Sequence, residues 1–266
     1  MVHALPKAGY PVHSIVTSRS SEIKEELKDK GIHIYSDISD AGSHFGQLIV
    51  LAVPDGIITP VVDSIVQKQI PLAGKIVVHC SGTLDSSDLD PLMALGAKIA
   101  SFHPMQAVTF NTTSFSGSWF DLEGDTEAIS VLQEICIGLH ARPIVVGKAE
   151  KPLLHIASVV ASNYVVTLAY IAGKIAGESG LDQKTLIKPL LRLMESSLAN
   201  IEQLGVEKAL TGPIKRGDLG TIRKHLLLLE DYKTFLDVYK KLGFITLDIV
   251  DDMDRVTRTE LADILS

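Results

Sequence analysis

The sequence has only two cysteines in 266 residues, Cys80 and Cys136, and both lie in apolar stretches. Two isolated cysteines do not make the disulfide framework that stabilises small secreted domains. The first residues, Met1–Pro6, carry neither the basic segment nor the apolar run of a secretory signal peptide. We therefore expect a protein of the reducing cytoplasm.

Positive charge is also scarce, since 25 Lys and Arg stand against 32 Asp and Glu. The net charge of −7 and the lack of a basic stripe argue against a nucleic-acid partner. The nine histidines have no metal-ligand spacing, and the acidic run 248–254 lacks the Gly and Glu of a calcium loop. We therefore predict no metal site. Neither a Walker loop nor a nucleophile elbow occurs.

Hydrophobic residues are plentiful, at 46% of the chain, and supply enough material for the cores of two domains. One uncharged run, 156–173, has nearly the length of a transmembrane helix. It contains polar residues such as Ser158 and Ser162, and His155 and Lys174 bound it. We interpret this run as a helix in the core of a dimer and expect no membrane segment.

The first half of the chain alternates apolar runs with helical patterns. The predicted strands are 12–19, 32–35, 47–53, 75–80, 98–103, an irregular one around 119–122, and 142–146. Helices are predicted at 21–30, 57–69, 88–95 and 125–139, and residues 1–9 have the pattern of a helix end that stops at Gly9. This alternation predicts an α/β fold with a mostly parallel, doubly wound sheet.

The second half has long helical patterns only. They cover 150–177, 183–204, 219–230, 232–242 and 251–266. In the second of them, apolar side chains recur at helical spacing from Leu186 to Ile201. We therefore predict an α/β domain over residues 1–149 and an all-helical domain over residues 150–266.

The ends of the predicted strands carry the candidate cofactor residues, because ligands of open parallel sheets bind beyond the carboxyl ends of the strands. In dinucleotide-binding folds an acid at the end of the second strand selects NAD, whereas an Arg there accommodates the 2′-phosphate of NADP. The first predicted strand of this chain takes the place of the second strand of such a fold, because we expect the first one to be missing. It ends in Ser18, Arg19 and Ser20, with no acid. This pattern favours NADP, although capping residues at an ordinary turn are the simpler alternative.

Three further strand ends offer suitable groups. They carry Val53 and Pro54, Ser81 and Gly82, and His103. Gly82 would allow a close backbone approach, and Pro104 would hold His103 extended with its ring past the sheet edge. Ordinary strand-exit turns would carry the same residues. We expect the first strand of the dinucleotide-binding unit, with its Gly-rich turn for the pyrophosphate, to be missing before residues 1–9.

Two groups in the helical half are candidates for contacting a substrate. His155, Ser158, Ser162 and Asn163 fall on one face of a helix. His155 would act as general acid, unless it is a core histidine bonded to a backbone carbonyl. Arg216 lies in a turn before a helix that Asp218 or Thr221 would cap, which makes it a candidate anion clamp.

These motifs together resemble one family. The matching segments are Ser18-Arg19, Leu51–Asp55, His79–Thr83, Phe102–Gln106, Ser162–Tyr164 and Leu210–Asp218. They resemble Rossmann-like proteins with a DUF2520 C-terminal domain, which are regarded as NADP oxidoreductases. That family is distantly similar to pyrroline-5-carboxylate reductase, ketopantoate reductase and the 6-phosphogluconate dehydrogenase group. The resemblance implies a Rossmann-like domain, a helical dimerisation domain and NADP(H) in the cleft.

The resemblance also implies a change of proton donor. In ketopantoate reductase a Lys on the first long helix of the second domain is the general acid, followed by two Asn residues. Aligning Asn163 with the later Asn places His155 at the Lys position and Val159 at the nearer Asn. One substrate contact of that reaction would therefore be lost.

Two hypotheses follow. The favoured one is an NADP(H)-dependent oxidoreductase that moves a hydride to or from a small carbonyl or imine, as a homodimer formed through the helical domain. Its substrate-facing residues would be His155, Ser162, Asn163 and Arg216. The alternative is a catalytically silent, dimeric nucleotide-sensing or scaffold protein.

Overall fold

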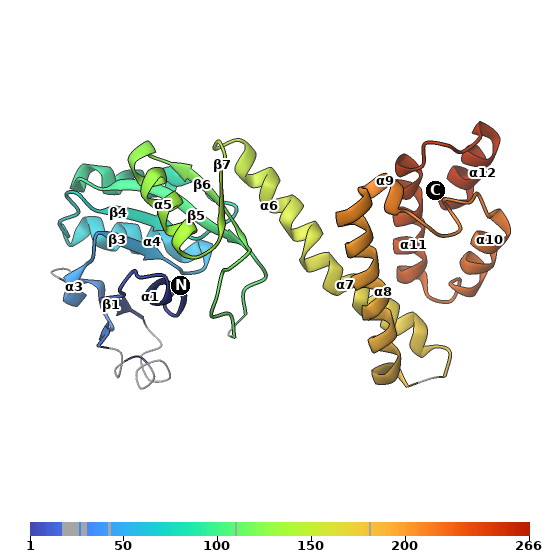
Figure 1. Ribbon diagram of the computed structural model, residues 1–266, viewed down its shortest axis with the longest axis horizontal. Coiled ribbons are helices and arrows are strands. Elements are labelled where there is room, and N and C mark those ends of the chain that lie inside the picture. Colours follow the sequence, from blue (N-terminus) through green and yellow to red (C-terminus); the bar gives the residue numbers. More distant parts are fainter. Residues whose placement is uncertain (18–26, 28–30, 42–43, 110, 181) are drawn as a thin grey trace. The chain divides into compact units, whose positions relative to one another are not determined.

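The computed structural model describes residues 1–17, 27, 31–41, 44–109, 111–180 and 182–266, and it divides into two compact units (Figure 1). The first unit is Met1–Asn163 and the second is Tyr164–Ser266. The predicted division at residue 149 stays a prediction. The predicted helix at 21–30, apart from Leu27, lies outside the described residues, as do Ser18, Arg19 and Ser20.

A five-stranded sheet forms the centre of the first unit. Its order is β3 (Leu48–Leu51), β4 (Ile76–His79), β5 (Lys98–Met105), β6 (Trp119–Gly124) and β7 (Arg142–Val145). A separate pair of parallel strands consists of β1 (Ser14–Val16) and β2 (His33–Tyr35). The predicted α/β fold with a mostly parallel, Rossmann-like sheet is confirmed.

The direction of the strands changes between β5 and β6. Strands β3 to β5 are parallel, β6 is antiparallel to β5, and β7 is parallel to β6. The described residues of the connection, 106–109 and 111–118, contain no helix, and the chain returns as an antiparallel neighbour. The helix between β6 and β7 then supplies a crossover that keeps these two strands parallel.

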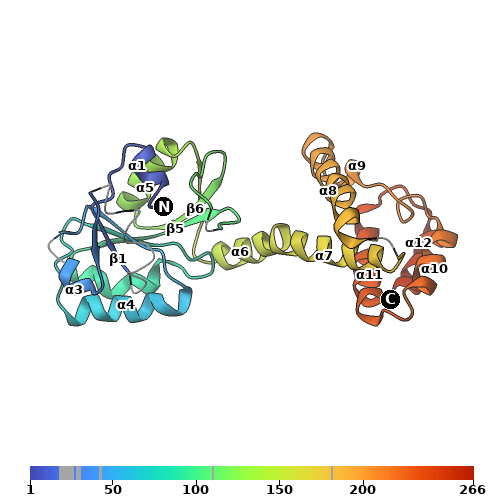
Figure 2. The same ribbon diagram turned by 90° about the horizontal axis from the view of Figure 1, so that it is seen from below.

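Helices cover both faces of this sheet (Figure 2). Helices α1 (Ala4–Lys7) and α5 (Thr126–Gly138) pack on the face that carries Val78 and Phe102. On the opposite face, α4 (Asp55–Gln67) and the 3₁₀ helix η2 (Ser86–Leu95) pack against Val77 and Ile99, with α3 (Ile38–Ala41) beside them. Neighbouring residues of one strand point to opposite faces, which is why both cores form on continuous apolar strands.

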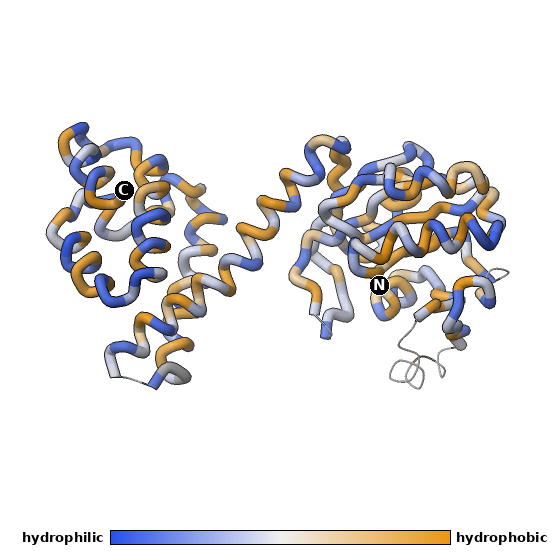
Figure 3. Tube along the Cα trace, turned by 180° about the vertical axis from the view of Figure 1, so that it is seen from behind, coloured by the Kyte–Doolittle hydropathy of each residue, from blue (hydrophilic) through white to orange (hydrophobic). Residues whose placement is uncertain are grey.

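The predicted helix over 150–177 divides at Ser162. The structure has α6 (Glu150–Ala161) and α7 (Asn163–Gly177), and the boundary between the two units falls after the first residue of α7. The two helices together are long and apolar enough to cross a membrane by length and composition, with 6% of the most apolar window buried. Figure 3 shows hydrophobic residues recurring along both of them. Within one chain this apolar surface is exposed.

The second unit is helical throughout its described residues. After α7 it contains α8 (Gln183–Leu204), α9 (Val206–Ala209), α10 (Leu219–Leu228), α11 (Lys233–Thr246), η3 (Leu247–Ile249) and α12 (Arg255–Leu265). Its core includes Ile222, Leu247 and Leu261. The predicted ranges of α8 and α10 to α12 agree with the structure to within four residues.

Candidate functional site

The turn after β4 is held by its own side chains. The buried His79 ring accepts a hydrogen bond from Ser81 N at 3.2 Å and lies 3.0 Å from the Asp85 carbonyl oxygen. Burial lowers the pKa of His79, so its ring stays neutral. The hydroxyl of Ser81 accepts hydrogen bonds from Thr83 N at 3.1 Å and from Leu84 N at 3.0 Å. The hydroxyl of Ser81, a predicted cofactor ligand, therefore stabilises this turn.

A buried carboxylate fixes the far end of the same loop. Glu123 on β6 is buried and accepts hydrogen bonds from Ser86 N at 2.6 Å and Ser86 Oγ at 2.8 Å. Asp85 caps the 3₁₀ helix η2 and lies 3.6 Å from Lys148 Nζ. The loop between β4 and η2 is thus tied to β6 and to the start of α6.

The centre of the site is an ion pair between Lys151 and Asp121. Lys151 lies on the first turn of α6 with its side chain fully buried, and its Nζ is 2.5 Å from Asp121 Oδ1. The other oxygen of Asp121 lies 2.5 Å from Nδ1 of His103. His103 and Asp121 are direct partners across the β5–β6 pair, which explains why their side chains meet.

These contacts keep Asp121 ionised. Burial alone would raise its pKa, but the hydrogen bonds from His103 and Lys151 and the positive charge of Lys151 outweigh that effect. The pKa of Asp121 is therefore lowered overall. Asp121 can orient His103 by accepting a hydrogen bond, and it neutralises a buried lysine.

His155 completes the group from the second turn of α6. Its ring meets the ring of His103 edge to face, with centroids 5.7 Å apart and an interplanar angle of 72°. Both rings lie against Gly82, and a Cβ there would overlap with Nδ1 of His155 and come within 2.9 Å of Nε2 of His103. The Nδ1 atom of His155 is buried and has no hydrogen-bond partner. Gly82 follows β4, so this pair of histidines touches the carboxyl edge of the sheet.

The structure extends one predicted strand. β5 continues past the predicted end at His103 to Met105 and pairs with β6 along that length, so His103 lies within the strand. Gly82 leaves room for a close approach, and the two histidine rings, which were not expected there, lie against it. Val53 packs at the edge of one core cluster, and Pro54 is the residue before α4.

The other substrate candidates are more dispersed. Ser158 donates a hydrogen bond to Leu154 O at 2.9 Å within its own helix. Ser162 and Asn163 lie at the division between α6 and α7, about 10 Å along the axis from His155. Arg216 is exposed in the second unit, near Asp218, which accepts from Thr221 N and so caps α10 as expected.

Sequence reasoning missed Lys151 and Asp121. The signal was present, because Asp121 is a charge inside an apolar strand pattern and therefore requires a buried partner. The alignment had placed His155 at the position of a catalytic Lys, whereas Lys151 lies one turn earlier on the same helix. Within the described ranges, no three His, Cys, Asp or Glu side chains gather as a metal site.

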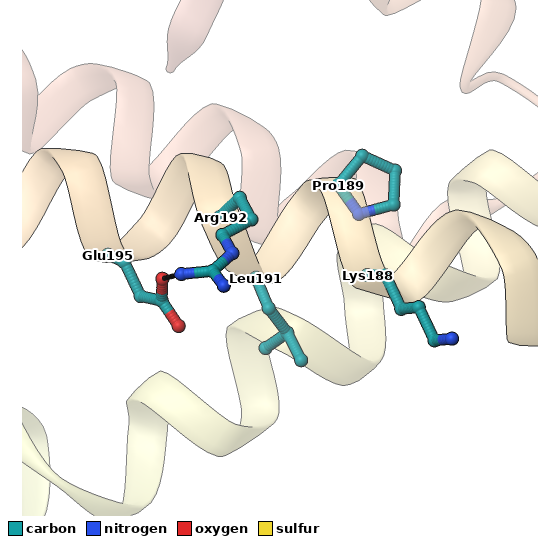
Figure 4. A pocket seen from close by; sticks show the side chains of 5 residues that line it. All are labelled: Lys188, Pro189, Leu191, Arg192 and Glu195. Atoms are coloured by element: carbon teal, nitrogen blue, oxygen red, sulfur yellow. Dashed lines mark hydrogen bonds and ion pairs between the residues drawn. The ribbon is translucent and has the colours of Figure 1, made fainter.

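Two surface hollows are lined by other residues. One of about 430 Å³ is bordered by His13, His33, Gln47 and Lys75, which lie at the amino ends of the strands. The other, of about 340 Å³, lies on α8 in the second unit, beside the exposed ion pair of Arg192 and Glu195 (Figure 4). Neither contains a candidate residue of the first unit's site.

The fold and this site define a class: a doubly wound α/β domain with a polar cluster at the carboxyl edge of its sheet, joined to a helical domain. Within that class, residues 1–104 match a Rossmann-like domain and residues 118–246 match the domain of unknown function DUF2520. The chain thus combines a Rossmann-like domain with a DUF2520 domain, and the resemblance is confirmed.

Solved structures share this architecture at low sequence identity. The protein TM1727 from Thermotoga maritima is 23% identical with a TM-score of 0.70, and the match covers 98% of this chain and 94% of that one. An imine reductase from Myxococcus stipitatus in complex with NADP⁺ is 15% identical with a TM-score of 0.66, covering 100% and 95%. The pyrroline carboxylate reductase of Plasmodium falciparum with NADP bound is 12% identical with a TM-score of 0.60, covering 100% and 93%. No curated protein sequence matches this chain.

Proposed function

We propose that this protein is an NADP(H)-dependent oxidoreductase that transfers a hydride to or from a small carbonyl or imine. One observation carries the proposal: the His103–His155 pair, a candidate acid–base group, touches Gly82 at the edge of the sheet where such folds bind nucleotides. The fold is shared with NADP-dependent reductases, which supports the choice of cofactor.

The described residues at this edge fit a nucleotide. Pro54 precedes α4 and offers no side-chain cap, and Gly56 in the first turn has open space beside it. Backbone N–H groups of such a turn suit the polar groups of a nucleotide. The orphaned Nδ1 of His155 marks unfilled hydrogen-bonding capacity next to Gly82.

The cofactor supplies the hydride chemistry, and the chain supplies binding, position and a proton. Ser18, Arg19 and Ser20 would hold the 2′-phosphate, while Val53, Pro54, Ser81 and Gly82 would line the ribose and nicotinamide. His155 would give the proton to the substrate, from its Nε2 atom. We assign Ser162, Asn163 and Arg216 to substrate contacts on the sequence pattern alone.

Binding of NADPH and NADH, measured by calorimetry, tests this proposal. We expect NADPH to bind more tightly, and Arg19→Ala to remove the preference by taking away the partner of the 2′-phosphate. Lys7→Ala, a basic residue at the end of α1, is the matched control and should leave the preference unchanged. If neither nucleotide binds, the proposal fails and the scaffold alternative gains support.

A positive binding result leads directly to a test of catalysis. Small ketones and cyclic imines would be offered with NADPH, and its oxidation would be followed by the loss of its absorbance. Turnover of either class supports the proposal, and His155→Gln should then reduce kcat by roughly 10²-fold or more, as expected for loss of a general acid. Turnover that is unaffected by His155→Gln would remove this residue from the reaction.

We also infer that a second copy of the chain covers the apolar surface of α6 and α7. Leu153, Ile156 and Val160 share one face of α6 and are 69%, 60% and 53% exposed. The opposite face of α6 carries Lys151, whose ion pair holds the first turn on the sheet. A helix that is anchored in this way and apolar on its outer side suits an interface between protein chains.

A further inference from the structure

We propose that His103 and His155 form a two-histidine proton relay across Gly82, with Asp121 and Lys151 as its positioning residues. The relay deepens the proposed oxidoreductase function and rests on it for its role in catalysis. The pairing of the two rings can be tested without a substrate.

Asp121 fixes one end of the relay. Its Oδ2 lies 2.5 Å from Nδ1 of His103, and a carboxylate can only accept, so His103 carries a proton on Nδ1. The other nitrogen of His103, Nε2, then faces Gly82. Lys151 binds the second carboxylate oxygen and so keeps Asp121 ionised, which holds His103 in this orientation.

His155 provides the other end. Its Nδ1 is buried without a partner, and both this atom and Nε2 of His103 border the position that a Cβ on Gly82 would occupy. The two nitrogens make no hydrogen bond with each other in this structure, and catalytic hydrogen bonds often tighten only when a substrate binds. Since the pair meets only at a glycine, any larger residue at position 82 would separate the two nitrogens.

The proton step balances without an imidazolate. Before it, His103 is an imidazolium beside the Asp121 carboxylate, and His155 is neutral with its proton on Nε2. Nε2 of His155 gives this proton to the substrate oxygen or nitrogen that bears the negative charge left by hydride addition. At the same time Nδ1 of His155 takes the Nε2 proton of His103. His103 ends neutral and regains a proton from water, to which its side chain is 14% exposed.

The surrounding groups favour one proton shared by the pair. On β4, the ring of His79 is hydrogen-bonded to the Asp85 carbonyl oxygen and stays neutral. Burial raises the pKa of the Cys80 thiol to about 12, so the thiol also stays neutral. From α6, Lys151 is paired with Asp121. Glu150 lies against Gly147, and Lys148 lies near Asp85. Asp121 is thus the one acid hydrogen-bonded to either ring among the described residues.

Histidine side-chain NMR on the full chain, labelled with ¹⁵N, tests the relay. We expect the ring protons of His103 and His155 to show a through-space contact, because the two rings meet edge to face. In Gly82→Ala the added Cβ would push the rings apart, and this through-space contact should be lost. Gly56→Ala is the matched control, because a Cβ there meets nothing within 4 Å.

A second variant covers the case in which Gly82→Ala does not fold. His103→Asn keeps a donor for Asp121 but removes the second imidazole, so the ring-nitrogen signals of His155 should move. Rings without a through-space contact in the unaltered protein, or His155 signals that stay in place in His103→Asn, would overturn the relay, whether or not NADPH binds. Paired rings in a protein that binds no NADPH would sustain the histidine pair and reject the oxidoreductase function.

Discussion

At the residue scale, the site depends on one lysine that has no contact with water. The Lys151 side chain is fully buried, and its charge is compensated by Asp121, which is also buried. Removing one partner of such a pair leaves an uncompensated charge in the interior, which costs more than the pair itself contributes. The exposed pair of Lys98 and Glu127, 3.2 Å apart at the edge of the same unit, provides a direct comparison.

Lys151→Met should therefore lower the free energy of unfolding by about 3–5 kcal/mol, because Asp121 remains charged and buried. The matched variant Lys98→Met should change it by less than about 1 kcal/mol. Urea unfolding at pH 7 measures both. Equal effects of the two variants would mean that the Lys151–Asp121 contact does not form.

Acid should weaken the same contact. Because the folded pKa of Asp121 lies below its unfolded value, its contribution to stability is present above about pH 4 and is lost as the pH falls through the folded value. In Asp121→Asn that contribution is absent at every pH. The difference in unfolding free energy between the two proteins should be constant at pH 5–7 and shrink below pH 4. A difference that grows on acidification would contradict the assigned direction.

The sequence identified only part of this group. His155 and Gly82 were predicted as site residues because of their position on a polar helix face and at a strand end. Their mutual contact was not predictable, because it depends on how α6 packs on β4. Asp121 stands out as a charge in an apolar strand pattern, but Lys151 is far from it in the sequence and nothing local identifies it as the partner.

At the scale of elements, three helices of the second unit begin in the same way. Asp182, Asp218 and Asp254 each precede a helix and accept a hydrogen bond from the backbone N–H of the Thr three residues later. This local pattern is readable from the sequence, because capping needs only neighbouring residues. It explains why the starts of α8, α10 and α12 are close to the predicted ones.

Asp254→Ala should destabilise the second unit by about 1 kcal/mol, since α12 loses its cap. Asp254→Asn should destabilise the second unit much less, because the amide oxygen of the Asn can still accept a hydrogen bond from Thr257 N. Asp251→Ala, three residues earlier, controls for the loss of an acidic charge in the same turn. Thermal unfolding followed by circular dichroism compares the three; equal losses for all would show that charge alone matters.

Other features of the elements escaped local reasoning. The reversed direction of β6 goes with a connection whose described residues form no helix. The Ser- and Thr-rich sequence of 107–118 did not predict this direction. The division of the long helix at Ser162 was also unexpected, because the apolar pattern continues through it. Neither feature is fixed by the preferences of single residues.

At the scale of the whole molecule, the exposed apolar face of α6 requires an explanation. Such a surface on one chain indicates a partner or a lipid phase. The ion pair of the fully buried Lys151 at the start of α6 holds this helix on the sheet. We have inferred that a second copy of the chain covers the exposed apolar face.

Ile156→Glu should shift the protein from dimer to monomer, because it places a charge in the centre of the proposed interface. Ile137→Glu is the control, since Ile137 is 68% exposed on α5 and lies outside that surface. Light scattering after size exclusion, at several protein concentrations, gives the mass. A monomer in the unaltered protein would reject the dimer, and sedimentation with lipid vesicles would then indicate a membrane partner.

The class of fold, the alternation of strands and helices, the helical second half and the capping of its helices can all be predicted from local sequence patterns. These properties follow from apolar periodicity and from hydrogen bonds between near neighbours. Tertiary packing links Lys151 to Asp121 and Asp121 to His103, and it sets the His103 and His155 rings against Gly82. These contacts need packing because β5, β6, α6 and the turn after β4 each contribute a part. The burial that sets their charges arises from packing between segments that are distant in the chain.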